Sequence, residues 1–76
     1  MSDIKKNKII EIISKIIKTD LKEITETSSM DDFTKWDSLS HLQIMLEVEK
    51  QFKKKISTSK MSDLNSVKRI LKFIES

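Results

Sequence analysis

The sequence predicts a small all-α protein, a bundle of three to four helices with a long loop between helices 1 and 2. Isoleucine, leucine and valine recur every three or four residues in three separate segments, the spacing of one face of an α-helix. The 76 residues include no Gly and no Pro, the residues that punctuate a small β fold. A chain of this length supports one hydrophobic core, so we expect a single domain over residues 1–76.

The three segments place the expected helices at residues 3–18, 38–53 and 66–75, with one short turn near residues 59–63. Asp37 is a good N-cap for the second helix, and Asn65 or Ser66 for the last. The connection over residues 19–36 is long for a compact domain, and its apolar residues suggest that it packs onto the bundle. The apolar residues of the three helices are Ile9, Ile10, Ile12, Ile13, Ile16 and Ile17; Leu39, Leu42, Ile44, Met45, Leu46, Val48 and Phe52; and Val67, Ile70, Leu71 and Ile74.

The composition excludes several classes of site. The chain has no Cys and one His, which excludes a disulfide framework, a thiolate nucleophile and a His or Cys metal site. Phosphate loops of the P-loop and Rossmann types need Gly, which is absent. No evident nucleophile–base pair remains, so we expect a protein that is not an enzyme. With no long apolar run and no signal-peptide pattern, we expect a cytoplasmic protein without stable membrane insertion. We also expect it to be a monomer.

The charge is unevenly distributed along the chain. The net charge is +3, but residues 31–52 carry five acids against two lysines, and residues 53–76 carry seven Lys or Arg against two acids. A basic nucleic-acid-binding domain is therefore one alternative. It is not favoured, because the basic residues are divided among both termini and the 53–60 connection. A helical protein–protein adaptor without chemistry of its own is the second alternative.

Ser38 is the hydroxyl with the most suggestive position. It follows Asp37 at the expected start of the second helix, where unpaired N–H groups and the helix dipole favour a bound or attached phosphate. Asp37 can cap the helix and help a partner enzyme to orient the hydroxyl. On position alone, Asp-Ser is also an ordinary capping pair.

The segment Asp37-Ser38-Leu39, followed by an amphipathic helix that ends near Glu49 and Phe52, resembles the signature of acyl carrier proteins and their relatives. The resemblance extends over nearly the whole chain. It implies that Ser38, flanked by Asp37 and Leu39, receives a 4′-phosphopantetheine arm from coenzyme A through a phosphopantetheinyl transferase. The arm's thiol would then hold an acyl or aminoacyl cargo, brought by a loading enzyme and passed to a downstream acyltransferase or synthase. The other matching features are Ile24, Ser28-Ser29-Met30, Asp31-Asp32-Phe33, Ile56, and the run from Asp63 to Ile74.

The chain also departs from the housekeeping members of that family. Carriers of general fatty-acid synthesis usually have Gly-X before Asp-Ser-Leu and acids two and five residues after the Ser. Here the preceding segment is Thr34-Lys35-Trp36, without Gly, and the two later places hold Ser40 and Gln43. The family is typically acidic, and this chain is basic. The resemblance therefore fits a carrier of a specialised pathway, such as polysaccharide, secondary-metabolite or aminoacyl metabolism.

Five residues around Ser38 are candidates for partner recognition. Trp36 either packs on His41 or Leu42 and fixes the path of the loop, or contacts a partner. His41 is expected to be an exposed helix residue that can face the arm or a partner. Glu49 is the acid retained from the family's acidic recognition face. The full set is Trp36, His41, Leu42, Met45 and Glu49.

Overall fold

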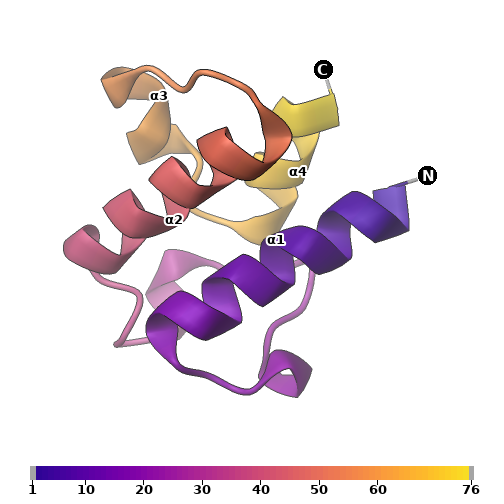
Figure 1. Ribbon diagram of the computed structural model, residues 1–76. Coiled ribbons are helices and arrows are strands. Elements are labelled where there is room, and N and C mark those ends of the chain that lie inside the picture. Colours follow the sequence, from indigo (N-terminus) through magenta and orange to yellow (C-terminus); the bar gives the residue numbers. More distant parts are fainter. Residues whose placement is uncertain (1, 76) are drawn as a thin grey trace.

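The computed structural model describes residues 2–75 and confirms the all-α prediction (Figure 1). Within these residues it contains four α-helices and two short 3-10 helices, and no strand apart from one isolated bridge. No helix in this range is both long and apolar enough to cross a bilayer. The elements are α1 (Ser2–Ile17), η1 (Leu21–Glu23), η2 (Met30–Asp32), α2 (Ser38–Phe52), α3 (Thr58–Asp63) and α4 (Val67–Glu75).

Helix α1 is the centre of the bundle, because it packs against both α2 and α4 (Figure 1). Its isoleucines at positions 9, 12, 13 and 17 are buried, and Ile10 and Ile16 are half-buried at the edge of the core. Isoleucine is only a moderate helix former, so α1 depends on burying this face. The other apolar core residues are Ile24, Trp36, Ile44, Met45, Val48, Ile56, Leu64, Val67, Ile70, Leu71 and Ile74.

The broad apolar face predicted for α2 is divided between the interior and the surface. Ile44, Met45 and Val48 are buried, whereas Leu39, Leu42 and Leu46 are 68%, 46% and 52% exposed. The buried residues follow the three-and-four spacing of a single stripe, and the leucines lie on the neighbouring side of the helix. The three leucines therefore belong to the broad apolar face of α2 but lie outside the core.

The long connection between α1 and α2 is fastened to the start of α4, as its apolar residues suggested. The backbone N–H of Met30 donates to the carbonyl of Asn65 at 2.9 Å, and the N–H of Val67 donates to the carbonyl of Ser28 at 3.0 Å. Ser29 and Ser66 thus form an isolated antiparallel bridge. The Ser28 carbonyl also satisfies one of the unpaired N–H groups at the start of α4. This fastening fixes the loop that leads to Ser38.

Two helices end in a left-handed residue that is not glycine. Lys18 has φ 55° after α1, and Lys53 has φ 54° after α2. The N–H of Lys54 then donates to the carbonyl of Glu49 at 3.2 Å, which closes the end of α2. A side chain with a Cβ costs about 1 kcal/mol in this backbone region. A Gly at either helix end would therefore make the folded state more stable.

We expect Lys53→Gly to raise the free energy of unfolding by about 0.5–1 kcal/mol, because glycine adopts a positive φ without a Cβ clash. The matched control is Lys50→Gly, an exposed position inside α2. There we expect a loss of about 0.5–1 kcal/mol from the lower helix propensity of glycine. Urea unfolding followed by the fluorescence of Trp36, the only tryptophan, measures both. If both variants changed the free energy of unfolding in the same direction, the left-handed conformation of Lys53 would not be the cause.

Candidate functional site

Ser38 is the first residue of α2, and its side chain is exposed. The preceding residue, Asp37, is extended (φ −92°, ψ −173°), and its carboxylate accepts a hydrogen bond from the backbone N–H of Ser40 at 2.9 Å. The predicted N-cap at Asp37 is therefore confirmed. The cap leaves the Ser38 hydroxyl outside the helix, at the end where the dipole is positive.

Hydrogen bonds at the helix start hold the pKa of Asp37 below its ordinary value of 3.8. The largest cause is the bond from the backbone N–H of Ser40, followed by a bond from the Ser40 side chain. Both favour the ionised carboxylate. Asp37 thus carries a negative charge at neutral pH, directly beside Ser38.

His41 lies in the interior, one turn after Ser38, and the prediction that it is exposed is wrong. Its side chain is only 7% exposed, and Trp36 is only 1% exposed. The indole Nε1–H of Trp36 donates to His41 Nδ1 at 3.0 Å, and His41 Nε2 lies 2.7 Å from the carbonyl oxygen of Met61. We call this chain of contacts the Trp36–His41–Met61 bridge. It links the loop before α2, the first turn of α2, and α3.

The bridge assigns the protonation of the imidazole ring. An indole N–H can only donate, so Nδ1 of His41 must accept. A neutral imidazole with an accepting Nδ1 carries its proton on Nε2, and this N–H donates to the Met61 carbonyl. The ring is therefore neutral, with both nitrogens satisfied. The expected packing of Trp36 near His41 takes the form of a hydrogen bond between rings whose centroids are 6.0 Å apart.

A cavity of about 350 Å³ opens beside Ser38, between α2, α3 and η2. Leu42 and Met61 supply apolar walls, and His41 borders the same space, so the Trp36–His41–Met61 bridge holds one wall in place. A cavity of this size falls within the range of small-molecule sites. Its lining residues are Met30, Ser38, His41, Leu42, Thr58, Met61, Ser62 and Asn65.

The remaining predicted recognition residues are in different environments. Met45 is fully buried and Trp36 nearly so, which leaves neither side chain available for direct contact with a partner. The Glu49 carboxylate accepts a hydrogen bond from the backbone N–H of Ile56 at 2.6 Å, so it secures the chain after α2. Leu39 and Leu42 are exposed next to Ser38. Leu42 is thus the member of the predicted recognition set that presents apolar surface beside the hydroxyl, together with Leu39, the residue predicted to flank the attachment point.

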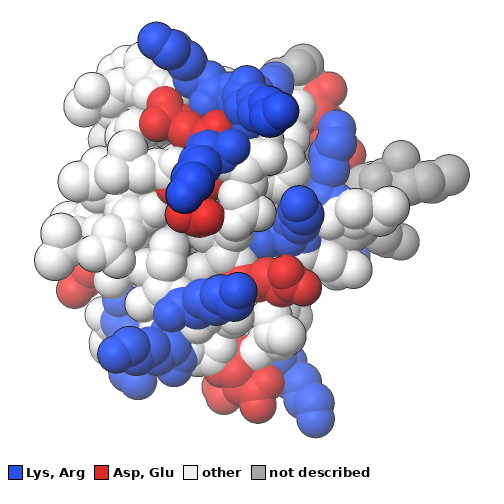
Figure 2. Space-filling model, in the orientation of Figure 1, with Lys and Arg blue, Asp and Glu red and all other residues white. Residues whose placement is uncertain are grey.

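The surface around Ser38 carries few charges. Residues 38–46 include no Asp, Glu, Lys or Arg. Figure 2 shows a largely uncharged edge on the left of the view, where α2 begins in Figure 1, and mixed charges elsewhere. Within residues 2–75 there is also no group of three His, Cys, Asp or Glu side chains that could hold a metal ion. The features of this site are thus a hydroxyl, a helix start and an apolar cavity.

Met30, Met61 and Asn65 border the cavity and were not among the predicted site residues. Met61 lies in a helix of six residues, too short to show periodicity. Its carbonyl meets His41 across twenty residues of sequence, and no local pattern signals such a contact. For His41 a signal did exist, because position 41 continues the buried stripe of positions 44, 45 and 48.

Comparison with known proteins gives one finding that bears on this site. A family model described as a phosphopantetheine attachment site matches residues 7–74, which include Ser38, the cavity and most of the core. No curated protein matches the chain.

We expect His41→Leu to lower the free energy of unfolding by about 1–3 kcal/mol, because the Trp36 indole N–H and the Met61 carbonyl lose their buried partner. Gln43→Leu, at an exposed position of the same helix, is the control and should change stability little. A double-mutant cycle with Trp36→Phe, followed by circular dichroism, tests the bond itself. Additive effects of the two substitutions would show that the bond contributes nothing.

The lowered pKa of Asp37 predicts a pH dependence of stability. The carboxylate form stabilises the folded state above the unfolded pKa, and this contribution is lost as the pH falls below 3.8 and through the lower folded pKa. Asp37→Asn should therefore flatten the fall in unfolding free energy in that acidic range. An NMR titration of the Asp37 carboxyl group should give a midpoint below 3.8, and a midpoint at or above 3.8 would contradict the cap geometry.

Proposed function

The chain belongs to the phosphopantetheine attachment site family, and from this membership we propose that Ser38 is the residue that bears the arm. Members of this family carry a covalent 4′-phosphopantetheine group, so the protein is a carrier protein. The observation that supports Ser38 is its exposed hydroxyl at the start of α2, inside the matched region and beside an apolar cavity. Ser28, by contrast, is buried, and its Oγ accepts a hydrogen bond from Thr25 N.

The residues around Ser38 fit a phosphate ester. The first N–H groups of α2 and the positive end of its dipole favour the negative phosphate. Asp37 is held by Ser40, so its charge is directed toward the helix backbone. In the transfer, Ser38 Oγ forms a bond to phosphorus while the bond to the nucleotide part of coenzyme A breaks. The phosphopantetheinyl transferase takes the hydroxyl proton.

When bound, the arm supplies a terminal thiol that holds the cargo as a thioester, a group that this Cys-free chain lacks. The protein's own residues orient the arm and shelter it and its cargo from water. Leu42 and Met61 line the space beside the attachment point, where an apolar part of the arm or cargo can lie out of water. The Trp36–His41–Met61 bridge holds α3 over this space.

We infer that the cargo is an acyl or aminoacyl group of a specialised pathway. Positions 40 and 43 are Ser and Gln, and Glu49 is engaged with the backbone of Ile56, so α2 offers little acidic surface to a partner. The exposed leucines at 39, 42 and 46 instead give an apolar stripe next to Ser38. Transferase, loading enzyme and downstream acyltransferase or synthase would all reach Ser38 across this stripe.

The test is the intact mass of the protein after incubation with coenzyme A and a broadly specific phosphopantetheinyl transferase. We expect the wild-type chain to gain one phosphopantetheine group. Ser38→Ala should gain nothing, because it lacks the accepting oxygen. Ser40→Ala, two residues along the same helix, is the matched control and should be modified.

A folded wild-type protein whose mass stays unchanged would refute the carrier role of Ser38. Modification of Ser38→Ala would place the arm on another hydroxyl. Circular dichroism of each variant shows whether it is folded before the mass is compared.

A further inference from the structure

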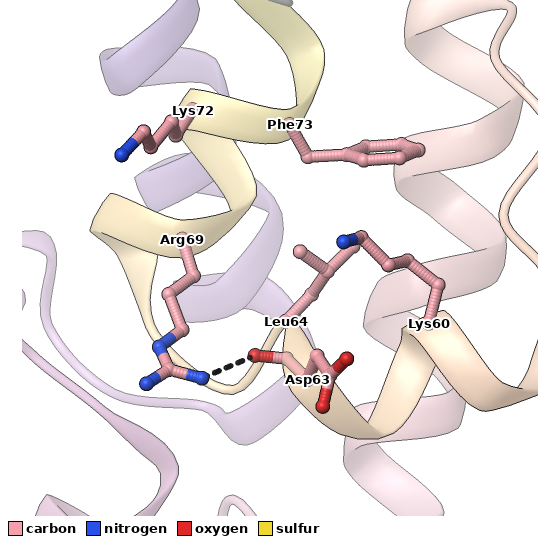
Figure 3. A pocket seen from close by; sticks show the side chains of 6 residues that line it. All are labelled: Lys60, Asp63, Leu64, Arg69, Lys72 and Phe73. Atoms are coloured by element: carbon pink, nitrogen blue, oxygen red, sulfur yellow. Dashed lines mark hydrogen bonds between the residues drawn. The ribbon is translucent and has the colours of Figure 1, made fainter.

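A second hollow, of about 400 Å³, lies between α3 and α4 (Figure 3). We call it the α3–α4 hollow. It is separate from the cavity beside Ser38, since α3 lies between them: Met61 and Ser62 face that cavity, and Lys60 and Asp63 face the hollow. The lining residues are Lys60, Asp63, Leu64, Arg69, Lys72 and Phe73.

The hollow concentrates positive charge. Lys60, Arg69 and Lys72 are all exposed, and Asp63 is the one acid among the lining residues. In the part of the chain that the structure describes, none of these three cations is paired with a carboxylate. A concave surface with three cations against one acid carries a net positive charge, which focuses the field and attracts an anionic partner.

Contacts within the hollow hold two of these cations, Arg69 and Lys60, in place. Arg69 donates from its guanidinium to the backbone carbonyl of Asp63 at 3.2 Å, which ties α4 to the end of α3 (Figure 3). The Lys60 ammonium lies 6.0 Å from the centre of the Phe73 ring, and the Lys54 ammonium lies 5.2 Å from it. Both distances are in the range of cation–π attraction. The half-buried Phe73 ring therefore forms an apolar wall beside the cations.

We propose that the α3–α4 hollow is a docking site for an acidic segment of a partner protein, which places carboxylates near Lys60, Arg69 and Lys72. Charge complementarity selects an acidic occupant. This goes beyond the role of Ser38, because the hollow requires no group on that residue.

Two other anionic occupants fit less well. A membrane surface would be met by protruding apolar side chains above a basic face, whereas here Leu64 is 3% exposed and Phe73 is recessed. A nucleic acid would be read by free aromatic or polar groups beside the cations. Phe73 is instead half-buried, with two lysines near its ring.

The experiment uses the ¹⁵N-labelled full chain and a synthetic peptide of glutamate and leucine as the probe. At low salt we expect the peptide to shift the amide signals of residues around the hollow, with Lys60, Arg69 and Phe73 moving most. Binding should weaken as salt is added, because exposed charges are screened. A peptide with lysine in place of glutamate should not bind.

The triple variant Lys60→Gln, Arg69→Gln, Lys72→Gln should bind the acidic peptide roughly tenfold more weakly, since each lost exposed contact has a modest effect. Its control is Lys5→Gln, Lys8→Gln, Lys22→Gln, which removes the same charge from exposed positions outside the hollow. The control and Ser38→Ala should bind as the wild type does. Unfolding followed by Trp36 fluorescence verifies that each variant is folded.

Three results would overturn the proposal. The first is equal weakening in the two triple variants, which would make net charge alone the cause. The second is an acidic peptide that leaves the signals of the hollow unmoved at low salt. The third is stronger binding, through the same residues, to phosphatidylglycerol vesicles or to a DNA duplex. Because Ser38→Ala is included, failure here is distinguishable from failure of the arm attachment.

Discussion

The hydrogen bond from the Trp36 indole to His41 is the contact on which the site depends. It joins Trp36, two residues before the start of α2, to the buried stripe of that helix. It also fixes the imidazole proton of His41 on Nε2. The same ring can then hold the Met61 carbonyl of α3. The loop before α2, the first turn of α2, and α3 thereby meet in one geometry. Ser38 lies between the two residues that make the bond, so its direction is set with them.

This contact adds to turns that the chain makes without Gly or Pro. In the connection from Lys18 to Asp37, the side chain of Asp20 caps η1 and the Ser29–Asp32 capping box starts η2, and packing against the bundle fixes the rest. It is held by buried Ile24, by the backbone pairing of Ser28 with Val67, and by Trp36. Each fastening uses groups that would otherwise be unpaired or exposed. The connection that leads to Ser38 is therefore held to the bundle along its length.

Local sequence patterns predicted the helices and their caps. They did not predict features that depend on contacts between residues far apart in the chain, such as the burial of His41. The helices and the Asp37 cap follow from local rules, and the structure confirms them. The predicted exposure of His41 is wrong, because position 41 continues the buried stripe of Ile44 and Val48. Its two partners, at separations of five and twenty residues, make a buried ring tolerable. The exposure of Leu39 could not be foreseen, because periodicity does not show which of the apolar residues of α2 the neighbouring helices cover.

The distribution of charge and apolar surface suggests two kinds of contact on one small bundle. Apolar contact is non-directional, so a stripe of exposed leucines beside Ser38 can serve enzymes of different shape in turn. Charge acts over longer distances and discriminates between partners by sign, which suits the α3–α4 hollow on the far side of α3. Because residues 38–46 carry no Asp, Glu, Lys or Arg, the two proposed surfaces differ in chemistry. Under the two proposals, one surface would hold a partner while enzymes act on the arm at the other.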